Sequence, residues 1–137
     1  MKGKKVGILG LGHIGMAVDS DILVVACRAD VSNRQAVNAA AMEAVGPKGM
    51  IVNVSRGSVI DEDALIEALK DGRLGRAGLD VFATEPTPPE RWEGVPGTVV
   101  TPHSAGGTVG SLPSMIAQTV ENLRRHFAGE ALLSPVA

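Results

Sequence analysis

Short apolar runs alternate with helical patterns along the chain. The runs lie at residues 5–9, 21–26, 50–54, 77–81 and 98–101. The run at 21–26 is apolar at successive positions, which is typical of a parallel strand covered by helices on both faces. This alternation predicts an α/β fold with a doubly wound parallel sheet.

Two helices are predicted inside this alternation. Ser32–Gln35 matches a capping box and predicts a helix to about Ala44. Asp61 is expected to cap a second helix, which ends at Asp71 and is terminated by a glycine.

The last predicted helix starts near Ser111 and ends at Gly129. One stripe of it is apolar, and core packing is the expected use of that stripe, with a subunit interface as the alternative. Its members are Met115, Ile116, Val120, Leu123 and Phe127.

Composition limits the class of protein. A chain of 137 residues can bury roughly two-thirds of its surface, which suffices for one core. The single Cys27 excludes an internal disulfide and indicates a reducing compartment, so we expect a cytoplasmic protein. A net charge of −2 and 2% aromatic residues argue against nucleic acid as a partner. No apolar stretch approaches the ~20 residues of a membrane span, and the histidines lack metal-ligand spacing, so we expect neither a membrane partner nor a metal.

A glycine-rich turn follows the first predicted strand. Gly10, Gly12 and Gly15 form a G-x-G-x-x-G pattern with His13 and Ile14 between them. In this position the glycines permit a tight turn and a close approach to a pyrophosphate, which the following helix N-terminus attracts. The pattern favours dinucleotide binding, although a glycine-rich turn before any helix would look similar.

The spacing after this turn is too short for a complete crossover. An acidic ribose ligand is expected about 20 residues on, which would select Asp30. A helix over residues 13–18 rises only about 9 Å, and crossovers usually take a dozen or more residues. We therefore expect a missing segment between Val18 and Asp19, which counts against Asp30 as the ligand.

Charged residues follow three successive predicted strands. Arg56 follows the strand at 50–54, Asp80 and Glu85 lie at and beyond the end of the next, and His103 follows the last. Because parallel strands end at one edge of the sheet, these side chains are expected to meet there, where ligands of open α/β sheets bind.

This set suits the reduction of a 2-oxo acid. Arg56 can bind a carboxylate, and His103 can exchange a proton at neutral pH. Glu85 near His103 would favour the imidazolium. Read one at a time, the same residues could be a capping cation, a turn histidine and a solvated charge.

Three motifs resemble the D-isomer-specific 2-hydroxyacid dehydrogenases, which include glyoxylate/hydroxypyruvate and hydroxyphenylpyruvate reductases. They are Val52-Asn53-Val54-Ser55-Arg56-Gly57, Gly78-Leu79-Asp80-Val81-Phe82 with Glu85-Pro86, and Thr101-Pro102-His103-Ser104-Ala105-Gly106-Gly107. The resemblance implies that Arg56 binds substrate, that Glu85 supports His103 and that His103 is the acid/base.

The resemblance also implies a Rossmann-type domain that binds NAD or NADP. The residues it assigns to the coenzyme are Gly10, Gly12, His13, Ile14, Gly15, Cys27, Arg28, Val54, Ser55, Arg56, Asp80, His103 and Gly106. Asp80 would contact the nicotinamide amide.

The chain departs from the family in two places. The resemblance leads us to expect only a C-terminal helix and tail of the substrate domain here, at 111–137, which in the family return to that domain. Residues 19–26 resemble the family's fourth strand, so the second and third strands are expected to be missing. Residues 1–137 are then an incomplete dinucleotide-binding domain with a break between residues 18 and 19.

These expectations describe an NAD(P)-dependent oxidoreductase that transfers a hydride between the coenzyme and a small 2-oxo/2-hydroxy acid, such as glyoxylate or hydroxypyruvate. The resemblance also suggests a homodimer. The alternative is a non-catalytic dinucleotide-binding or dimerisation module.

Overall fold

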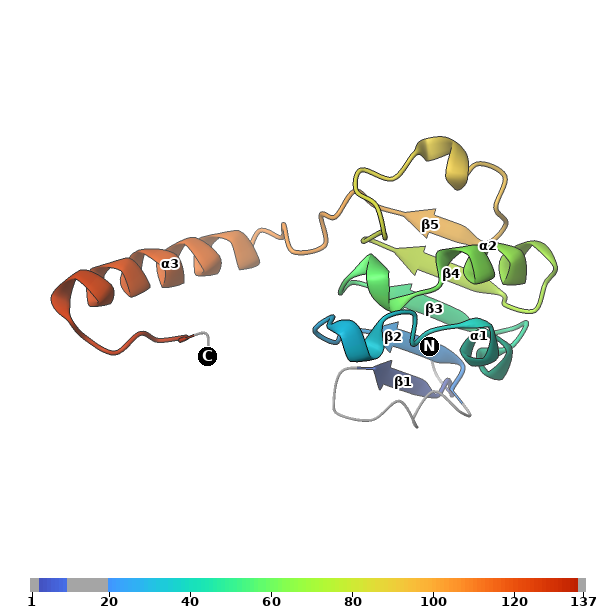
Figure 1. Ribbon diagram of the computed structural model, residues 1–137, viewed down its shortest axis with the longest axis horizontal. Helices are drawn as coiled ribbons and strands as arrows, with labels where there is room; N and C mark the ends of the chain where they lie inside the picture. Colours follow the sequence, from blue (N-terminus) through green and yellow to red (C-terminus); the bar gives the residue numbers. More distant parts are fainter. Residues whose placement is uncertain (1–2, 10–19, 136–137) are drawn as a thin grey trace. The chain divides into compact units, whose positions relative to one another are not determined.

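The computed structural model describes residues 3–9 and 20–135 (Figure 1). The chain forms two compact units, residues 1–103 and 104–137. The predicted turn at Gly10–Gly15 and the predicted break after Val18 lie outside the described residues.

The first unit is built on a parallel sheet of five strands. Its strands are β1 (Val6–Leu9), β2 (Ile22–Val25), β3 (Met50–Asn53), β4 (Arg76–Leu79) and β5 (Thr98–Val100). Their order in the sheet follows the chain, and every neighbouring pair is parallel. This arrangement confirms the predicted α/β class with a parallel sheet.

The neighbour of β1 bears on the predicted gap. β1 pairs with β2 in register from Val6 opposite Ile22 to Leu9 opposite Val25. In a Rossmann sheet with strand order 3-2-1-4-5-6, the fourth strand is the one that lies beside the first in this way. The pairing therefore agrees with the interpretation of residues 19–26 as a fourth strand, while the break itself stays a prediction.

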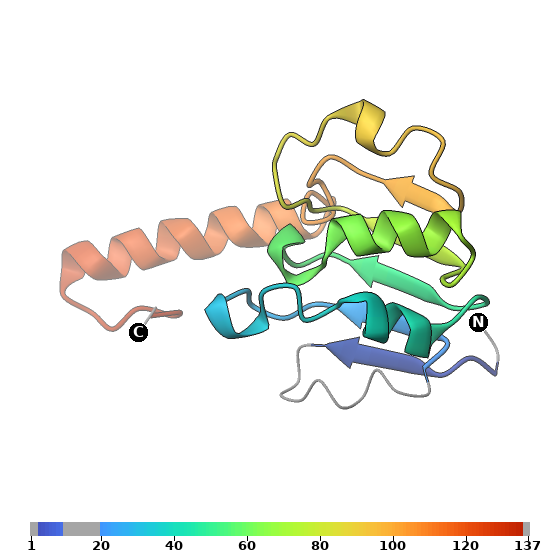
Figure 2. The same ribbon diagram turned by 45° about the vertical axis from the view of Figure 1, so that its right-hand side comes forward.

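Among the described residues, the α-helices of this unit lie on one face of the sheet (Figure 2). These helices are α1 (Ala39–Val45) and α2 (Glu62–Lys70), which pack against each other. Successive right-handed crossovers in one direction place their helices on the same side. Alternate strand residues such as Leu23 and Ile51 are buried in the resulting core. The opposite face is half-exposed, so helical cover of both faces is not seen within the described residues.

The predicted helix at 32–44 is wrong in its first half. A 3-10 turn occupies Val31–Asn33, and a capping box closes on Asp30, whose carboxylate accepts from the Ser32 amide at 2.7 Å. Gln35 then adopts φ = 51°, which ends the turn, and α1 begins only after its own cap at Asn38. The capping box thus starts two residues earlier than expected and encloses a single turn.

The predicted second helix is confirmed. Asp61 caps α2 by accepting a hydrogen bond from the Ala64 amide at 3.1 Å. Asp71 ends the helix, and Gly72 follows with φ = 78°, a conformation that glycine adopts without steric cost.

The second unit contains α3 (Ser111–Ala128), which ends at Gly129 in the left-handed conformation, as predicted. The prediction that its apolar stripe packs in a core is wrong within this unit, because every residue of the stripe is exposed. Among residues 104–135, α3 is the sole helix or strand, so this unit offers the stripe no second element to pack against.

Candidate active site

The predicted residues lie at the carboxyl edge of the sheet, in loops that are hydrogen-bonded to one another. The Asp80 amide donates to the Asn53 carbonyl at 3.0 Å, and the His103 amide donates to the Asp80 carbonyl at 2.8 Å. These hydrogen bonds hold the ends of β3, β4 and β5 next to one another. This brings the segments that carry Arg56, Glu85 and His103 to one edge, as the sequence predicts.

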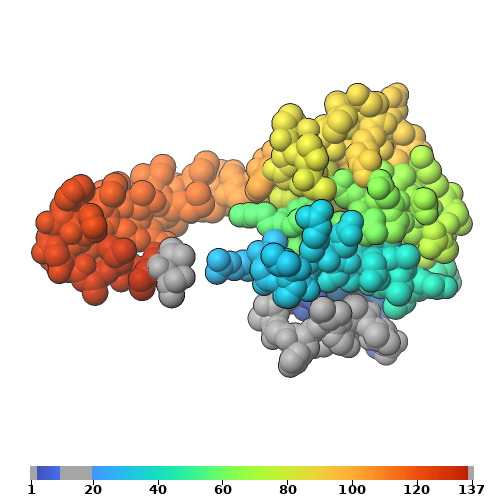
Figure 3. Space-filling model, viewed as in Figure 1, coloured from blue at the N-terminus to red at the C-terminus, as the bar shows by residue number. Residues whose placement is uncertain are grey.

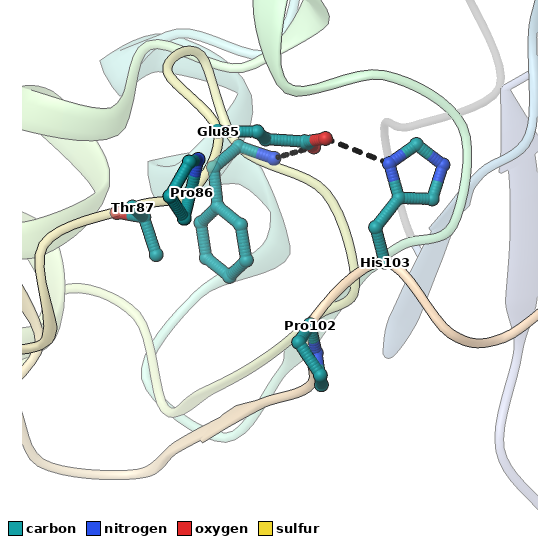
Figure 4. A pocket seen from close by; sticks show the side chains of 6 residues that line it. Glu85, Pro86, Thr87, Pro102 and His103 are labelled. Atoms are coloured by element: carbon teal, nitrogen blue, oxygen red, sulfur yellow. Dashed lines mark hydrogen bonds and ion pairs between the residues drawn. The ribbon is translucent and has the colours of Figure 1, made fainter.

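Glu85 and His103 form a direct pair (Figure 4). His103 Nδ1 lies 2.7 Å from Glu85 Oε2. An ionised carboxylate can only accept, so Nδ1 carries the hydrogen in this pair. The other oxygen, Oε1, accepts from the Phe82 amide at 2.8 Å. Both carboxylate oxygens are thus held, which fixes the orientation of the imidazole ring.

The electrostatics of the pair favour the charged carboxylate. The hydrogen bond from His103 lowers the pKa of Glu85 most, followed by the bond from the Phe82 amide. The positive charges of His103 and Arg56 also contribute to the lowered pKa of Glu85. Arg56 is therefore close enough to the pair for its charge to act on it.

The backbone at His103 is strained and firmly held. Its φ of 52° lies in the left-handed region, which is uncommon for residues other than glycine. Its amide donates to the carbonyls of Asp80 and Thr101 at 2.8 and 3.0 Å. Strain of this kind persists where the surroundings fix the conformation, and it clusters at functional sites.

Asp80 lies beneath this turn. Its side chain is buried, and Oδ1 accepts from the Thr101 hydroxyl at 2.5 Å. The carboxylate thereby braces the segment that leads into His103. Its expected contact with a nicotinamide amide stays a prediction.

Glu85 and His103 line a cavity of about 380 Å³ (Figure 4). Phe82, Pro86, Thr87 and Pro102 complete the lining. This combination of mostly apolar walls with one acid–base pair is typical of sites for small molecules.

Arg56 lines a second cavity of about 560 Å³ beside the ends of β2 and β3. Its Nη1 donates to the Ser55 carbonyl at 2.6 Å, and its side chain is exposed. Cys27, Arg28 and Ser55, all expected to contact the coenzyme, share the same lining. Two guanidinium groups and the hydroxyls of Ser55 and Ser58 make this cavity suitable for an anionic, polar ligand such as a dinucleotide.

Among the described residues, the others expected to contact the coenzyme do not line this cavity. Val54 is exposed at the end of β3, and Gly106 belongs to the second unit. Those in the Gly10–Gly15 turn lie outside the described residues.

Asn53 holds the turn that carries Arg56, a role that was not predicted from the sequence. This residue is 1% exposed, and its Oδ1 accepts from both the amide and the hydroxyl of Ser55 at 3.0 Å. Its Nδ2 donates to the Arg56 carbonyl at 3.0 Å. The sequence signal for this role was a polar residue at the end of an otherwise apolar strand.

Gly57 was also missed as a functional position. A Cβ on Gly57 would lie 1.8 Å from the carbonyl carbon of Phe82 and 2.2 Å from the Ala83 nitrogen. The turn that follows Arg56 therefore touches the backbone that binds Glu85. Glycine alone allows this approach.

Metal sites and membrane spans are two further features to consider in the described part of the chain. No three His, Cys, Asp or Glu side chains gather as metal ligands among residues 3–9 and 20–135. Of the helices in the described part of the chain, none combines the length and apolar character needed to cross a membrane.

Comparison with known proteins identifies related reductases. Hydroxyphenylpyruvate reductase of Plectranthus scutellarioides is 39% identical over 169 residues, which cover 98% of this chain and 54% of that protein. Glyoxylate/hydroxypyruvate reductase A of Arabidopsis thaliana gives the same identity and coverage. This chain has 137 residues, so the 169-residue alignments contain positions without a counterpart here. The chain spans about half the length of these relatives.

Solved structures show the same likeness. The NADPH-dependent glyoxylate/hydroxypyruvate reductase of Sinorhizobium meliloti, in complex with NADP and malonate, is 34% identical with a TM-score of 0.89. The match covers 100% of this chain and 54% of that one. Residues 16–105 match the family described as D-isomer specific 2-hydroxyacid dehydrogenase, NAD binding domain. The chain therefore belongs to the D-isomer specific 2-hydroxyacid dehydrogenases and represents their NAD-binding domain.

Proposed function

We propose that the protein transfers a hydride between NADH or NADPH and a small 2-oxo/2-hydroxy acid, as glyoxylate/hydroxypyruvate reductases do. The observation that carries this proposal is the His103–Glu85 pair at 2.7 Å, with the charge of Arg56 acting on the same carboxylate. A proton donor and a carboxylate-binding cation at one sheet edge are what this reaction requires.

When bound, the coenzyme would supply the hydride for the new C–H bond at the carbonyl carbon. Arg56 binds the substrate carboxylate through paired N–H donors. His103 gives a proton to the carbonyl oxygen as the C=O π bond breaks, so the product is a 2-hydroxy acid. Because Nδ1 is engaged by Glu85, Nε2 is the nitrogen that exchanges this proton. Glu85 stabilises the imidazolium and holds the ring.

The lining of the larger cavity, beside Arg56, supports the assignment of the residues that bind the coenzyme. We assign Cys27, Arg28 and Ser55 to it, because they line the space beside Arg56 at the ends of β2 and β3. The turn at Gly10–Gly15 is assigned to the pyrophosphate by its sequence pattern. Asp80, Val54 and Gly106 are proposed contacts from the family resemblance.

Steady-state oxidation of NADH and NADPH with glyoxylate or hydroxypyruvate tests this function. General acid catalysis contributes about 10²–10⁴-fold, so His103→Ala is expected to lower kcat by at least about 100-fold. Arg56→Ala is expected to raise KM for the oxo acid by about 10- to 100-fold, because a charge-assisted hydrogen-bonding partner is lost. Equal rates in wild type and His103→Ala would refute the assignment.

A non-catalytic dinucleotide-binding or dimerisation module is the second candidate, supported by the polar cavity beside Arg56 and by the exposed apolar stripe of α3. Titration of NADPH fluorescence separates the two. Coenzyme binding without turnover in the wild type, unchanged by His103→Ala, would support the module.

We also propose a cytoplasmic homodimer. The exposed apolar stripe of α3 supports the dimer, and the single cysteine, Cys27, supports the cytoplasmic location. Light scattering after size-exclusion chromatography tests the dimer, which Leu123→Glu on the stripe is expected to weaken.

A further inference from the structure

The loop between β4 and β5 carries Glu85 but has little regular structure of its own. One 3-10 turn, at Pro89–Arg91, is the helical element within it. Outside that turn the loop lacks the regular backbone hydrogen bonds of a helix or sheet, so side-chain contacts must decide where Glu85 lies.

A buried carboxylate from α2 makes two of these contacts. Glu62 is 8% exposed, and its Oε1 accepts from the Ala83 amide at 2.6 Å. Its Oε2 accepts from Arg91 Nε at 3.2 Å. Glu62 is therefore bonded near both ends of the segment from Ala83 to Arg91, and the space-filling view shows this loop, in yellow, next to the green atoms of α2 (Figure 3).

Adjacent amides of one turn bind the two glutamates. The Phe82 amide donates to Glu85, and the Ala83 amide donates to Glu62. A rotation of this turn that released Glu62 would also redirect the amide that holds Glu85. The position of Glu85 is thus coupled to the bond between Glu62 and Ala83.

Arg91 pairs with Glu62 on the side of the carboxylate away from Ala83. It bridges the buried Glu62 and Asp63, whose side chain is 83% exposed, with Nη2 to Oδ1 at 2.7 Å. A buried carboxylate is costly without a charged partner, so the ion pair with Arg91 stabilises Glu62 in its position beside the loop.

We propose that Glu62, assisted by Arg91, is a positioning residue that sets the geometry of the Glu85–His103 pair. This assignment rests on the proposed function for its catalytic meaning, whereas the positioning itself is measurable without turnover. The hydrogen bonds of Glu62 go to Ala83 and Arg91, so it acts on the pair through the turn at Phe82–Ala83.

The test is ¹³C NMR titration of the Glu85 carboxyl in the full chain, with Glu85→Gln identifying its signal. In the wild type, pairing with His103 and the Phe82 amide holds the pKa of Glu85 below its usual value. Glu62→Ala is expected to move that midpoint up toward the ordinary glutamate range, because the turn loses its anchor. Glu62→Gln keeps an oxygen for the Ala83 amide and is expected to restore most of the wild-type titration.

Arg91→Ala provides a second variant should Glu62→Ala fail to fold, and it is expected to shift Glu85 in the same direction. Arg73→Ala is its matched control. Arg73 pairs with Asp71 at the other end of α2, at a similar exposure, and its loss is expected to leave Glu85 unchanged. A folded Glu62→Ala or Arg91→Ala protein in which Glu85 titrates as in the wild type would overturn the proposal.

Activity gives an independent readout. If the wild type reduces glyoxylate, Glu62→Ala is expected to lower kcat about tenfold or more, with KM for the coenzyme unchanged, because His103 is misplaced. Absence of turnover in the wild type would contradict the proposed function while leaving the titration result to decide the role of Glu62.

Discussion

Gly57→Ala tests whether the Arg56 turn and the Glu85 turn are one packed unit. The added Cβ would meet the Phe82 carbonyl carbon at 1.8 Å, whereas ordinary contact begins at 3.4 Å. One turn must therefore shift by about 1.6 Å. Both sides of the contact are backbone, so neither can turn aside as a flexible side chain would.

The expected cost follows from this geometry. Overpacking costs typically 1–3 kcal/mol, and a backbone clash belongs at the upper end, about 3 kcal/mol. With a urea m-value of about 2 kcal/mol/M, the unfolding midpoint should fall by about 1.5 M. A shift above 1 Å at a catalytic group can also reduce activity by about 100-fold.

Trp92 makes the measurement specific. It is the single tryptophan of the chain and is 7% exposed in the loop that carries Glu85. Its fluorescence during urea unfolding therefore reports on the segment that Gly57→Ala displaces. The matched control is Gly78→Ala, whose Cβ would meet only Val52 Cγ2 at 3.8 Å, and its effect is expected within about 0.5 kcal/mol. A Gly57→Ala midpoint equal to that of the control would refute the close packing.

Three further predictions are checked by unfolding or by NMR. Asp61→Ala removes the α2 cap and is expected to cost about 1 kcal/mol in urea unfolding, while Asp61→Asn should retain most of the stability. Trp92→Phe removes the Nε1 donor to Thr87 Oγ1 at 2.9 Å and is expected to cost about 1 kcal/mol, measured by circular dichroism; no loss would contradict that bond's contribution. Hydrogen bonds from Arg124 and Arg125 lower the pKa of Glu121 on α3 to about 2. A lowered folded pKa stabilises the helix above the usual glutamate pKa, so α3 should lose this contribution as the pH falls from about 4 to 2. ¹³C NMR should give that midpoint, and a value near the unshifted 4.5 would contradict the pairing.

Local signals were sufficient for most elements of the fold. Asp61 begins α2 and Gly129 ends α3, as predicted, because a cap depends on residues a few positions apart. The strands were found for a similar reason, since each is a short apolar run. The helix expected at 32–44 failed because Asp30 and Asn33 form a reciprocal capping box around a single 3-10 turn, which ends before Gln35 at φ = 51°.

The sequence by itself also determined which residues could carry the chemistry. Arg56, Glu85 and His103 follow successive strands, and parallel strands end at one edge, so their convergence needed only the order of the elements. Only the tertiary structure decided how they are held. The contact of Gly57 with Phe82, and the bond from Ala83 to Glu62, join segments more than twenty residues apart. Such contacts depend on register and loop path, which neighbouring residues do not encode, and they become visible only when the sheet has brought the loops together.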